Sequence, residues 1–320
     1  MQKTLNAAIV GAGSIGGLID TPKSVNIASH AHAYAKENTC SLKAICEVDK
    51  NNRDEFIKRW GKVNTYASTQ ELVNSESIDI LSIASPTKYH LQNLQEALQM
   101  SGISHILCEK PLVLTQKELT QIKEELLKSD KKILINIIRR YNPIFIDLAK
   151  QIKKNGFGKV LSFHGNFTKG LLHNGIHMLE LLNHLFGKIC KLKSLNVKQL
   201  EDDLSGEFYI ECENAKGSLV CIESIDYSLF ELDIVFENGK IQISDGGDTI
   251  SIYKKVPSVV YEGYFTLKHS RTLKDVMQKY ASDSLNFLLN ENHLKCKEIL
   301  KEHIKIHEII FETIKKERQL

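Results

Sequence analysis

Short apolar runs alternate with helix-like stretches through the first 140 residues of the chain. The helix-like stretches carry apolar residues at three- and four-residue spacing, and the last of them opens with Thr115 and Glu118 at the spacing of a capping box. Strands that alternate with helices predict a parallel sheet covered by helices. The predicted strands are residues 7–10, 42–46, 78–84, 104–108 and 133–138, and the predicted helices are residues 51–60, 89–99 and 115–129.

The pattern changes after Pro143, where extended segments begin to follow one another across short turns. Asn238 and Gly239 join two of these segments as a tight hairpin. Strands that follow one another across short turns predict an antiparallel sheet. The predicted helices of this part are residues 143–154 and 174–185, and the predicted strands are residues 159–167, 192–197, 206–213, 217–225, 230–236, 240–244 and 249–253.

The tail from residue 282 onward is predicted to be helical. A rough apolar stripe along it is expected to dock onto the body of the protein. The stripe consists of Leu294, Ile299, Ile304, Ile306, Ile310 and Ile314. The whole pattern predicts an α/β fold with a doubly wound parallel sheet over residues 1–140. A second α+β domain with a large, mainly antiparallel open sheet is predicted over residues 141–320.

Composition narrows the classes of protein that fit this pattern. A chain of 320 residues can form two domains that each bury a core. Its 42 Lys and Arg balance 39 Asp and Glu and are scattered, so nucleic acid is not an expected partner. The sequence contains neither a signal peptide nor a run of apolar residues long enough to span a membrane, so no membrane partner is expected. Its seven cysteines include no C-x-x-C pair and fit reduced core thiols in a cytoplasmic protein.

A glycine-rich turn follows the first predicted strand and precedes residues that can form a helix. In this context the first glycine permits a tight turn, the second lets the backbone approach a pyrophosphate, and the third packs helix against strand. The turn therefore predicts a bound dinucleotide. The residues expected to contact it here are Gly11, Gly13, Ser14, Ile15 and Gly16.

Glu47 lies at the end of the second predicted strand, where a carboxylate can bind the adenosine ribose. An acid at this place repels a 2′-phosphate, which favours NAD over NADP; Asp49 is the rival carboxylate. Glu47 follows the glycine turn by more than the roughly 20 residues that are usual. The excess is residues 20–32, which we interpret as an inserted loop or an extended helix start. His30 and His32 within it are expected to face solvent or to bond locally.

Two turns at the carboxyl ends of neighbouring strands carry the candidate reactive groups. Ser85, Pro86 and His90 follow the third predicted strand, and Glu109 and Lys110 follow the fourth. Ligands of open α/β sheets bind at these ends. A partly desolvated lysine near a cationic nicotinamide can exchange a proton with a substrate hydroxyl. The alternative is an ordinary surface lysine in a turn.

A second constellation begins the apolar helix of the other domain. His173 and His177 are four residues apart, with Asn174 beside the first, and share a face if both are helical. The spacing could suit zinc, but there is no H-E-x-x-H pattern and no evident third ligand, so we expect no metal. A structural histidine pair stays open. We favour binding of a substrate hydroxyl and proton transfer, with His177 as the better candidate.

Several motifs in order make the chain resemble the glucose-fructose oxidoreductase, inositol dehydrogenase and rhizopine catabolism family, written Gfo/Idh/MocA. They are GAGSIG, CEVD, ASPTKYH, CEKPL, NIIRRYNP and the start of the apolar helix, within roughly residues 7–187. The resemblance implies an NAD(P)-binding Rossmann domain and a substrate-binding domain whose sheet makes the contacts of a homodimer or homotetramer. It also implies hydride transfer between nicotinamide and a sugar, inositol or nucleotide-sugar derivative.

The resemblance also assigns roles to individual residues. Lys110 falls on the family's catalytic lysine and His177 on its second-domain histidine. Glu109 would line the nicotinamide side, and the turn with Ser85, Pro86 and His90 would lie against the cofactor. Arg140 and Tyr141 would lie near the domain junction and contact the substrate, together with His173, Asn174 and His177.

One position departs from the family's pattern. His173 stands where many sugar dehydrogenases of the family have an aspartate, so the carboxylate that would bind a hydroxyl or orient His177 is absent from that position. An imidazole there could favour an anionic group on the substrate. Reduction of an imine or enone is a second reading of the chemistry. A cofactor-binding sensor without catalysis is the alternative from another class.

Overall fold

The computed structural model describes residues 4–223 and 225–319, and the chain forms two compact units. Unit 1 comprises Met1–Tyr141 and Gln278–Lys305, and unit 2 comprises Asn142–Met277 and Ile306–Leu320. The predicted division placed the whole tail in the second domain, whereas Gln278–Lys305 groups with the first unit. The reason is packing, because Ala281, Leu285 and Leu288 of the tail belong to the core of unit 1.

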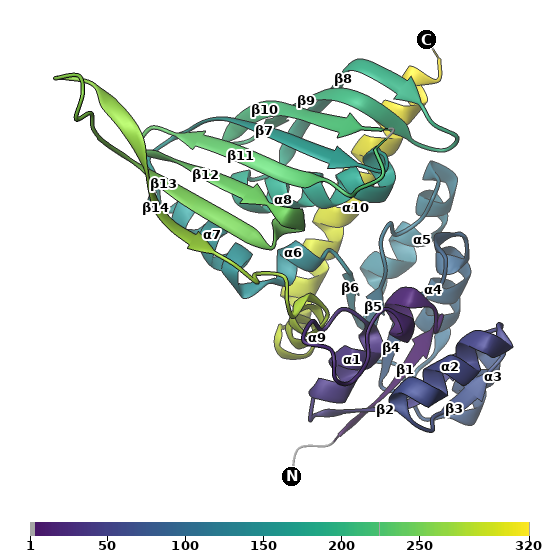
Figure 1. The fold of residues 1–320 in the computed structure, drawn as a ribbon. Coiled ribbons are helices and arrows are strands. Elements are labelled where there is room, and N and C mark those ends of the chain that lie inside the picture. The colour runs from purple at the N-terminus through teal and green to yellow at the C-terminus, as the bar shows by residue number, and fades with distance from the viewer. Residues whose placement is uncertain (1–3, 224, 320) are drawn as a thin grey trace. The chain divides into compact units, whose positions relative to one another are not determined.

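Unit 1 contains a six-stranded, wholly parallel sheet in the order β3-β2-β1-β4-β5-β6 (Figure 1). This is the strand order of a Rossmann fold, which confirms the predicted doubly wound sheet. The inner strands read as continuous apolar runs because they are buried on both faces. The strands are β1 (Leu5–Val10), β2 (Cys40–Cys46), β3 (Asn64–Tyr66), β4 (Ile80–Ile83), β5 (His105–Cys108) and β6 (Lys132–Ile135).

Several helices of unit 1 begin at side chains that cap them. Thr115 and Glu118 form the predicted capping box at the start of α5, because each side chain bonds the other's backbone N–H. Asp49 caps α2, and Ser29 caps α1. The helices are α1 (His30–Lys36), α2 (Lys50–Trp60), α3 (Thr69–Ser75), α4 (His90–Gln99), α5 (Gln116–Lys128), α6 (Ile138–Tyr141) and α9 (Tyr280–Asn290), with a 3-10 turn η2 (Thr87–Tyr89) before α4.

The ring of His105, the first residue of β5, is partly buried and hydrogen-bonded to Ser104 Oγ at 2.7 Å. Burial, helped by the charge of Lys132, lowers the pKa of His105 from 6.5 to about 4. The unfolded chain therefore takes up this proton at higher pH than the folded chain does, so stability falls as the pH drops from 6.5 to about 4. We expect His105→Gln to lose less stability than the wild type over this range in urea unfolding. Equal losses in both proteins would contradict this prediction.

Unit 2 contains an eight-stranded sheet in the order β14-β13-β12-β11-β7-β10-β9-β8, antiparallel except for the β7–β10 pair. This confirms the predicted, mainly antiparallel sheet. Strand β14 was not predicted, because most of its side chains are exposed and leave no alternating pattern. Residue 224, at the end of the predicted strand 217–225, lies outside the described residues. The strands are β7 (Val160–Thr168), β8 (Ile189–Gln199), β9 (Leu204–Cys212), β10 (Ala215–Ile222), β11 (Phe230–Phe236), β12 (Gly239–Ser244), β13 (Thr249–Pro257) and β14 (Phe265–Leu273).

One face of this sheet is covered by helices α7 (Pro143–Lys153) and α8 (Ile176–Phe186) (Figure 1). Along β11 the buried residues alternate with partly exposed ones, as expected for a strand with one covered face. Helix α8 is buried along nearly its whole length, which explains its apolar sequence. Two further short turns belong to this unit, a π turn η3 (Leu171–Gly175) and a 3-10 turn η4 (Asp245–Gly247).

The tail is helical as predicted, with α9 followed by α10 (His293–Glu317). The five isoleucines of the predicted stripe are buried, but Leu294 is 78% exposed. The prediction for Leu294 was wrong because, at 3.6 residues per turn, its side chain points to the side of the helix opposite the face shared by Ile299, Ile306 and Ile310. Within residues 4–223 and 225–319, no helix is long and apolar enough to cross a membrane.

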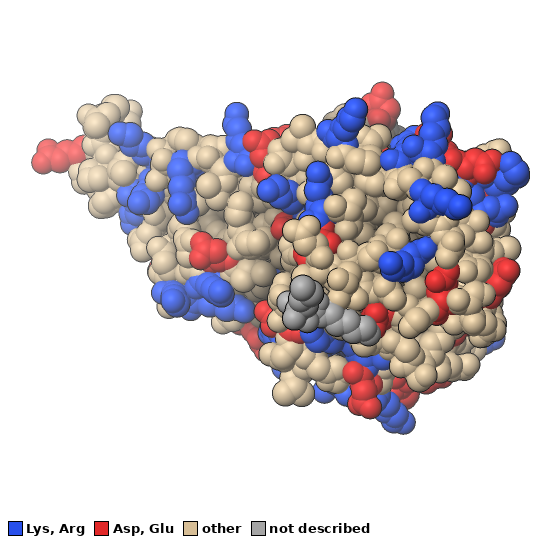
Figure 2. Space-filling view, turned by 90° about the horizontal axis from the view of Figure 1, so that it is seen from below, with Lys and Arg blue, Asp and Glu red and all other residues tan. Residues whose placement is uncertain are grey.

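The charged side chains and most of the cysteines lie where the composition led us to expect them. Basic and acidic side chains are interspersed over the face seen in Figure 2. All seven cysteines are free thiols, and six of them are buried as predicted, whereas Cys190 is exposed. Burial raises the pKa of Cys40 and of Cys46 to about 11, so both stay protonated and inert at neutral pH.

Candidate functional site

The glycine turn after β1 is built by close backbone contacts. Gly11 has φ +91°, and a Cβ there would lie 2.5 Å from the backbone nitrogen of Ser85. A Cβ on Gly16 would lie 2.0 Å from the Gly11 carbonyl oxygen. A Cβ on Gly13, by contrast, would meet nothing within 4 Å. The outer two glycines thus pack the turn, and the middle one leaves open space where a pyrophosphate could approach the backbone.

The predicted insertion, residues 20–32, begins as a loop and ends in a helix. A single π turn, η1 (Ser14–Leu18), contains the third glycine, Gly16, and the Ile19 N–H donates to Ser14 O at 2.9 Å. Helix α1 begins at His30. Residues 19–29 therefore form a loop between η1 and α1, within the long interval between Gly11 and Glu47.

The Glu47 side chain connects the end of β2 to the glycine turn. Its Oε2 accepts a hydrogen bond from the Ala12 N–H at 2.9 Å, and its Oε1 accepts one from the Asp49 N–H at 2.9 Å. The rival Asp49 instead accepts from the N–H groups of Asn51 and Asn52 at 2.7 and 3.2 Å. Glu47 lines the cavity at the end of β2 and Asp49 does not, so Glu47 is the better candidate for the ribose.

A cavity of about 270 Å³ lies beside Glu47, at the carboxyl ends of β1, β2 and β4. It combines apolar walls with a carboxylate and hydroxyl groups, which suits the adenosine part of a dinucleotide. Three of the predicted residues, Gly11, Ser85 and Pro86, line it with Glu47. The remaining lining residues are Val10, Cys46, Val48, Ala67, Ser68, Thr69, Tyr89, Gln92, Asn93 and Glu96.

His90 joins two turns and does not line this cavity. Its Nδ1 lies 2.9 Å from Pro111 O and its Nε2 lies 2.9 Å from Ser85 O. Burial lowers the pKa of His90, although the hydrogen bonds to these carbonyls act in the opposite direction. The ring is fully buried. His90 thus connects the turns after β4 and β5 through its two ring nitrogens.

The Glu109 carboxylate, at the end of β5, is held by two donors. Asn136 Nδ2 donates to its Oε1 at 2.6 Å, and His30 Nε2 lies 3.1 Å from the same oxygen. Burial alone would raise the pKa of Glu109. The hydrogen bonds from His30 and Asn136 and the charges of His30 and Lys110 outweigh it and lower that pKa. Glu109 is therefore an anion at neutral pH.

His30 corrects the expectation for the histidines of the insertion. His30 is 3% exposed and His32 is fully buried, so neither faces solvent. His32 is locally bonded, with Nδ1 3.0 Å from Asp20 Oδ2. His30 instead reaches Glu109 across 79 residues of sequence. No sequence motif links His30 to Glu109, because the two residues lie 79 positions apart.

Lys110 follows Glu109 directly and precedes Pro111 across a cis peptide bond. The residue is partly buried, and its charge contributes to the lowered pKa of Glu109. A partly buried lysine beside a buried anion, at the carboxyl end of a central parallel strand, fits a group that exchanges protons better than it fits a surface turn lysine.

Asp203 supplies a carboxylate to His173 in unit 2. Its Oδ2 lies 3.0 Å from His173 Nδ1, and its two oxygens also accept hydrogen bonds from the N–H groups of Leu172, His173 and Leu204 at 2.8, 3.1 and 2.7 Å. Asp203 is 4% exposed, whereas the His173 side chain is 47% exposed. The sequence near the start of α8 lacks a carboxylate, and Asp203 in the segment before β9 supplies one to His173. Sequence reasoning missed it because the partners are 30 residues apart.

Gly170 makes this pairing possible. It has φ +80°, and a Cβ there would lie 2.1 Å from Asp203 Oδ2. His173 lies in the π turn η3, whereas His177 lies in the first turn of α8 and is 6% exposed. Asn174 Nδ2 donates to Thr168 O at 2.9 Å and so ties the turn to the end of β7. Within the described residues, no group of three or more His, Cys, Asp or Glu side chains could hold a metal ion.

Arg140 and Tyr141 have structural contacts in unit 1. The Tyr141 hydroxyl donates to Ile135 O at 2.6 Å, and its ring centroid lies 4.9 Å from that of Phe287. Arg140 is buried and pairs with Glu302. These contacts favour a role in the core of the unit over the predicted contact with a substrate.

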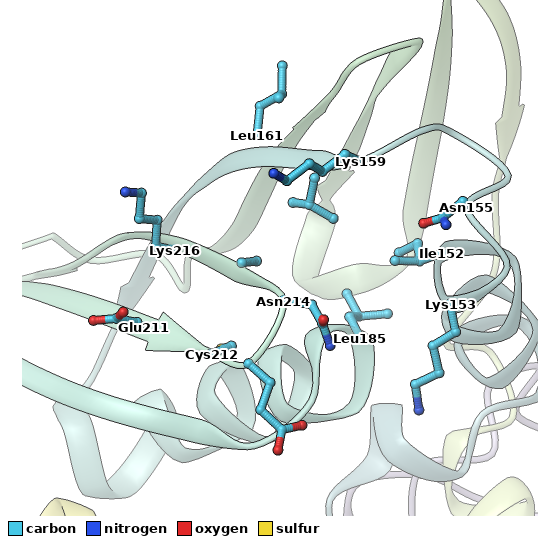
Figure 3. Close-up of a pocket in the computed structure, with 13 residues that line it drawn as sticks. Ile152, Lys153, Asn155, Lys159, Leu161, Leu185, Glu211, Cys212, Asn214 and Lys216 are labelled. Carbon is cyan, nitrogen blue, oxygen red and sulfur yellow. The ribbon is translucent and has the colours of Figure 1, made fainter.

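A cavity of about 690 Å³ lies in unit 2 and is lined by none of the predicted site residues. Its lysines Lys153, Lys159 and Lys216 point in different directions (Figure 3), and Glu211 and Glu213 add the opposite charge. A ligand site needs a few polar groups that converge, so this cavity does not suggest one. The other lining residues are Ile152, Asn155, Val160, Leu161, Leu185, Cys212, Asn214 and Ala215.

Comparisons with known proteins agree with this geometry. Residues 5–137 match the Gfo/Idh/MocA model, described as an oxidoreductase family with an NAD-binding Rossmann fold. Oxidoreductase P35 of Formosa agariphila is 22% identical over 92% of this chain and 94% of its own length. Inositol 2-dehydrogenase 1 of Paenarthrobacter aurescens is 25% identical over 82% of this chain and 81% of its own length. D-glucoside 3-dehydrogenase of Escherichia coli is 21% identical over 62% of this chain and 58% of its own length.

Solved structures share the fold over nearly the whole chain. Levoglucosan dehydrogenase in complex with NADH has a TM-score of 0.72 at 17% identity, covering 98% of this chain and 97% of that one. An oxidoreductase from Agrobacterium radiobacter in complex with NAD+, L-tartaric acid and magnesium has a TM-score of 0.72 at 13% identity, covering 97% and 96%. Over residues 5–137 the chain is thus similar to the NAD-binding Rossmann domain of the Gfo/Idh/MocA oxidoreductases, and over nearly its whole length it shares the fold of these solved structures.

Proposed function

We propose that this protein is an NAD-dependent oxidoreductase that acts on a hydroxyl or ketone carbon of a sugar, inositol or nucleotide-sugar derivative. The observation that carries the proposal is the pair of Lys110 and the anionic Glu109 at the carboxyl end of β5, in the same unit as the dinucleotide turn. Relatives named inositol 2-dehydrogenase and D-glucoside 3-dehydrogenase, and a fold shared with levoglucosan dehydrogenase, support the choice of a sugar-like substrate.

Lys110 is proposed as the general acid and base. When bound, nicotinamide supplies the acceptor or donor of hydride. In the reducing direction the Lys110 ammonium donates a proton to the carbonyl oxygen of the substrate, and in the oxidising direction the amine takes the hydroxyl proton. The fixed charge of Glu109 attracts the ammonium and holds it near the end of β5. The backbone of the turn at Gly13 would hold the pyrophosphate, and Glu47 would accept hydrogen bonds from the ribose hydroxyls.

Unit 2 is proposed to bind the substrate through its histidines. With Asp203 accepting from Nδ1, the His173 ring presents Nε2 to a ligand in a fixed tautomer. The carboxylate offsets the charge of an imidazolium, so the pair suits a sugar hydroxyl better than the anionic group considered for an isolated histidine. His177 assists as a second hydrogen-bonding group in the first turn of α8.

A panel assay tests the proposal. The protein with NAD+ is offered monosaccharides, inositols and nucleotide sugars, and formation of NADH is followed by its absorbance in the near ultraviolet. We expect NADH to form with at least one sugar-like alcohol. Tight binding of NADH without turnover of any compound would favour the cofactor-binding sensor. Product analysis separates alcohol oxidation from the reduction of an imine or enone.

Glu47 is proposed to select NAD over NADP. Glu47→Gln removes the charge that opposes a 2′-phosphate, so we expect the ratio of NADP+ to NAD+ affinity to rise about tenfold, which corresponds to about 1.4 kcal/mol. Isothermal titration with both dinucleotides measures the ratio. Asp49→Asn is the matched control, because it removes a nearby charge but keeps a residue that caps α2. An equal rise in both variants would show that Glu47 has no special role.

Self-association through unit 2 is also proposed. One face of its sheet is covered by α7 and α8, and the residues that alternate with the buried ones lie on the other face. A second copy of the chain packed on that face would form the homodimer or homotetramer expected for the family. Light scattering of the purified protein measures the oligomeric state, and a monomer at micromolar concentration would contradict this proposal.

A further inference from the structure

A single buried carboxylate organises the inserted segment between η1 and α1. Asp20 Oδ2 accepts hydrogen bonds from the N–H groups of Ala28 and Ser29 at 2.7 and 3.0 Å. Its Oδ1 accepts one from the Ser29 hydroxyl, and His32 Nδ1 lies 3.0 Å from Oδ2. Asp20 is 6% exposed. The two ends of the loop are therefore tied together, although the loop contains no regular secondary structure.

This tie fixes the start of α1. Ser29, which is bonded to Asp20, also caps the helix by accepting from the His32 N–H at 3.1 Å. His30 is the next residue after this cap and the first of the helix. On the other side of the loop, Trp60 Nε1 donates to Gly17 O at 2.7 Å and anchors η1. The position of His30 thus depends on Asp20 through Ser29.

His30 completes the support of Glu109. Both donors, His30 Nε2 and Asn136 Nδ2, reach Oε1, and within residues 4–223 and 225–319 no hydrogen bond to Oε2 is present. The two donors come from different elements, one from the start of α1 and one from the residue after β6. The titratable groups whose charges act on or are affected by Glu109 are His30, His90, Cys108, Lys110 and Tyr280.

We propose that His30 is a positioning residue that holds the Glu109 carboxylate beside Lys110, and that the Asp20-centred insertion exists to place His30. The inference rests on the proposed function only for the role of Lys110. Without His30, only the Asn136 hydrogen bond and the charge of Lys110 would oppose the effect of burial on Glu109, and the carboxylate would turn or take up a proton more readily. In either case Lys110 would lose the fixed anion next to it.

A direct test follows the Glu109 carboxylate by NMR in protein labelled with ¹³C at the glutamate side-chain carboxyl carbon, using Glu109→Gln to identify the signal. We expect His30→Ala to raise the pKa of Glu109 by about 1 or more, because the hydrogen bond and the charge of His30 are lost and only Asn136 and Lys110 still act against burial. His30→Gln keeps an N–H donor and should raise it less than half as far. Asp20→Asn should shift it in the same direction. An unchanged pKa of Glu109 in His30→Ala and His30→Gln would overturn the proposal.

Turnover of a substrate found in the panel assay gives the second readout. A misplaced group can lower the rate about 100-fold, so we expect His30→Ala to lower kcat about 30- to 100-fold, with the dissociation constant of NADH changed less than threefold. His30→Gln should restore most of kcat. The double variant of His30→Ala and Glu109→Gln should be no slower than Glu109→Gln alone, since His30 acts through Glu109.

His105→Gln is the matched control, because it changes a partly buried histidine at the other end of β5 and should leave kcat within twofold at neutral pH. If the losses of kcat in His30→Ala and in Glu109→Gln multiplied in the double variant, the proposal would be overturned. An unaltered kcat in His30→Ala would overturn it as well. If His30→Ala does not fold, His30→Gln and Asp20→Asn decide the question. If Lys110→Ala kept full turnover, the proposed function would fail, while the NMR titration would still judge His30.

Discussion

Replacement of Lys110 by alanine is expected to lower kcat about 1,000-fold, while the dissociation constant of NADH changes less than threefold. General acid–base catalysis by one side chain typically contributes 10²- to 10⁴-fold, and Lys110 directly follows the anionic Glu109 at the end of β5. The proposed contacts with the pyrophosphate and the ribose come from the glycine turn and from Glu47, so binding of NADH should persist. Steady-state kinetics and titration of the protein fluorescence with NADH measure the two quantities.

Two further variants separate proton transfer from charge. Lys110→Arg keeps a cation but cannot give up its proton at neutral pH, so it should be nearly as inactive as Lys110→Ala. Lys88→Ala changes an exposed lysine in η2, at the end of the neighbouring strand, and should keep kcat within twofold. Full activity in Lys110→Arg would mean that Lys110 acts only as a charge. Full activity in Lys110→Ala would remove it from the mechanism.

Asp203→Ala is expected to destabilise unit 2 strongly and to abolish the orientation of His173. Three backbone N–H groups and one imidazole would lose their acceptor at a position that is 4% exposed. At about 1 kcal/mol or more for each unsatisfied donor, the free energy of unfolding should fall by about 3 kcal/mol. Urea unfolding measures this loss.

His173→Ala separates the structural and functional parts of this pair. The ring is about half exposed, so its removal should change the free energy of unfolding by less than about 1 kcal/mol. If His173 binds a substrate hydroxyl, the same variant should still lower kcat/KM at least tenfold. A stability loss as large as that of Asp203→Ala would contradict this division, and an unaltered kcat/KM would remove His173 from the substrate site.

The parallel sheet of unit 1 could be predicted because burial on both faces makes each inner strand a continuous apolar run. Strand β3 escaped prediction, since its three residues are at most partly buried. In unit 2 the alternating strands were predicted, but β14 was not, because it pairs along one edge of the sheet with its side chains in solvent. Sequence patterns report burial, so elements without burial leave no pattern.

The candidate site also has a part that could be predicted from the sequence and a part that could not. Short motifs contain Gly11, Gly13 and the Glu109-Lys110 pair. Their spacing reflects backbone geometry, so the sequence alone could predict them. The contacts of His30 with Glu109 and of His173 with Asp203 join residues far apart in sequence. Nothing near either histidine specifies its partner, because the partner is selected by how the loops fold.

Because Gln278–Lys305 packs into unit 1, the order of synthesis affects how this unit can fold. Residues 1–141 leave the ribosome first, but they lack α9, whose Ala281, Leu285 and Leu288 complete their core. Until α9 follows, the apolar surface that it covers stays open and can attract other chains. The NAD-binding unit thus cannot be completed until unit 2 up to Met277 and then α9 have been translated.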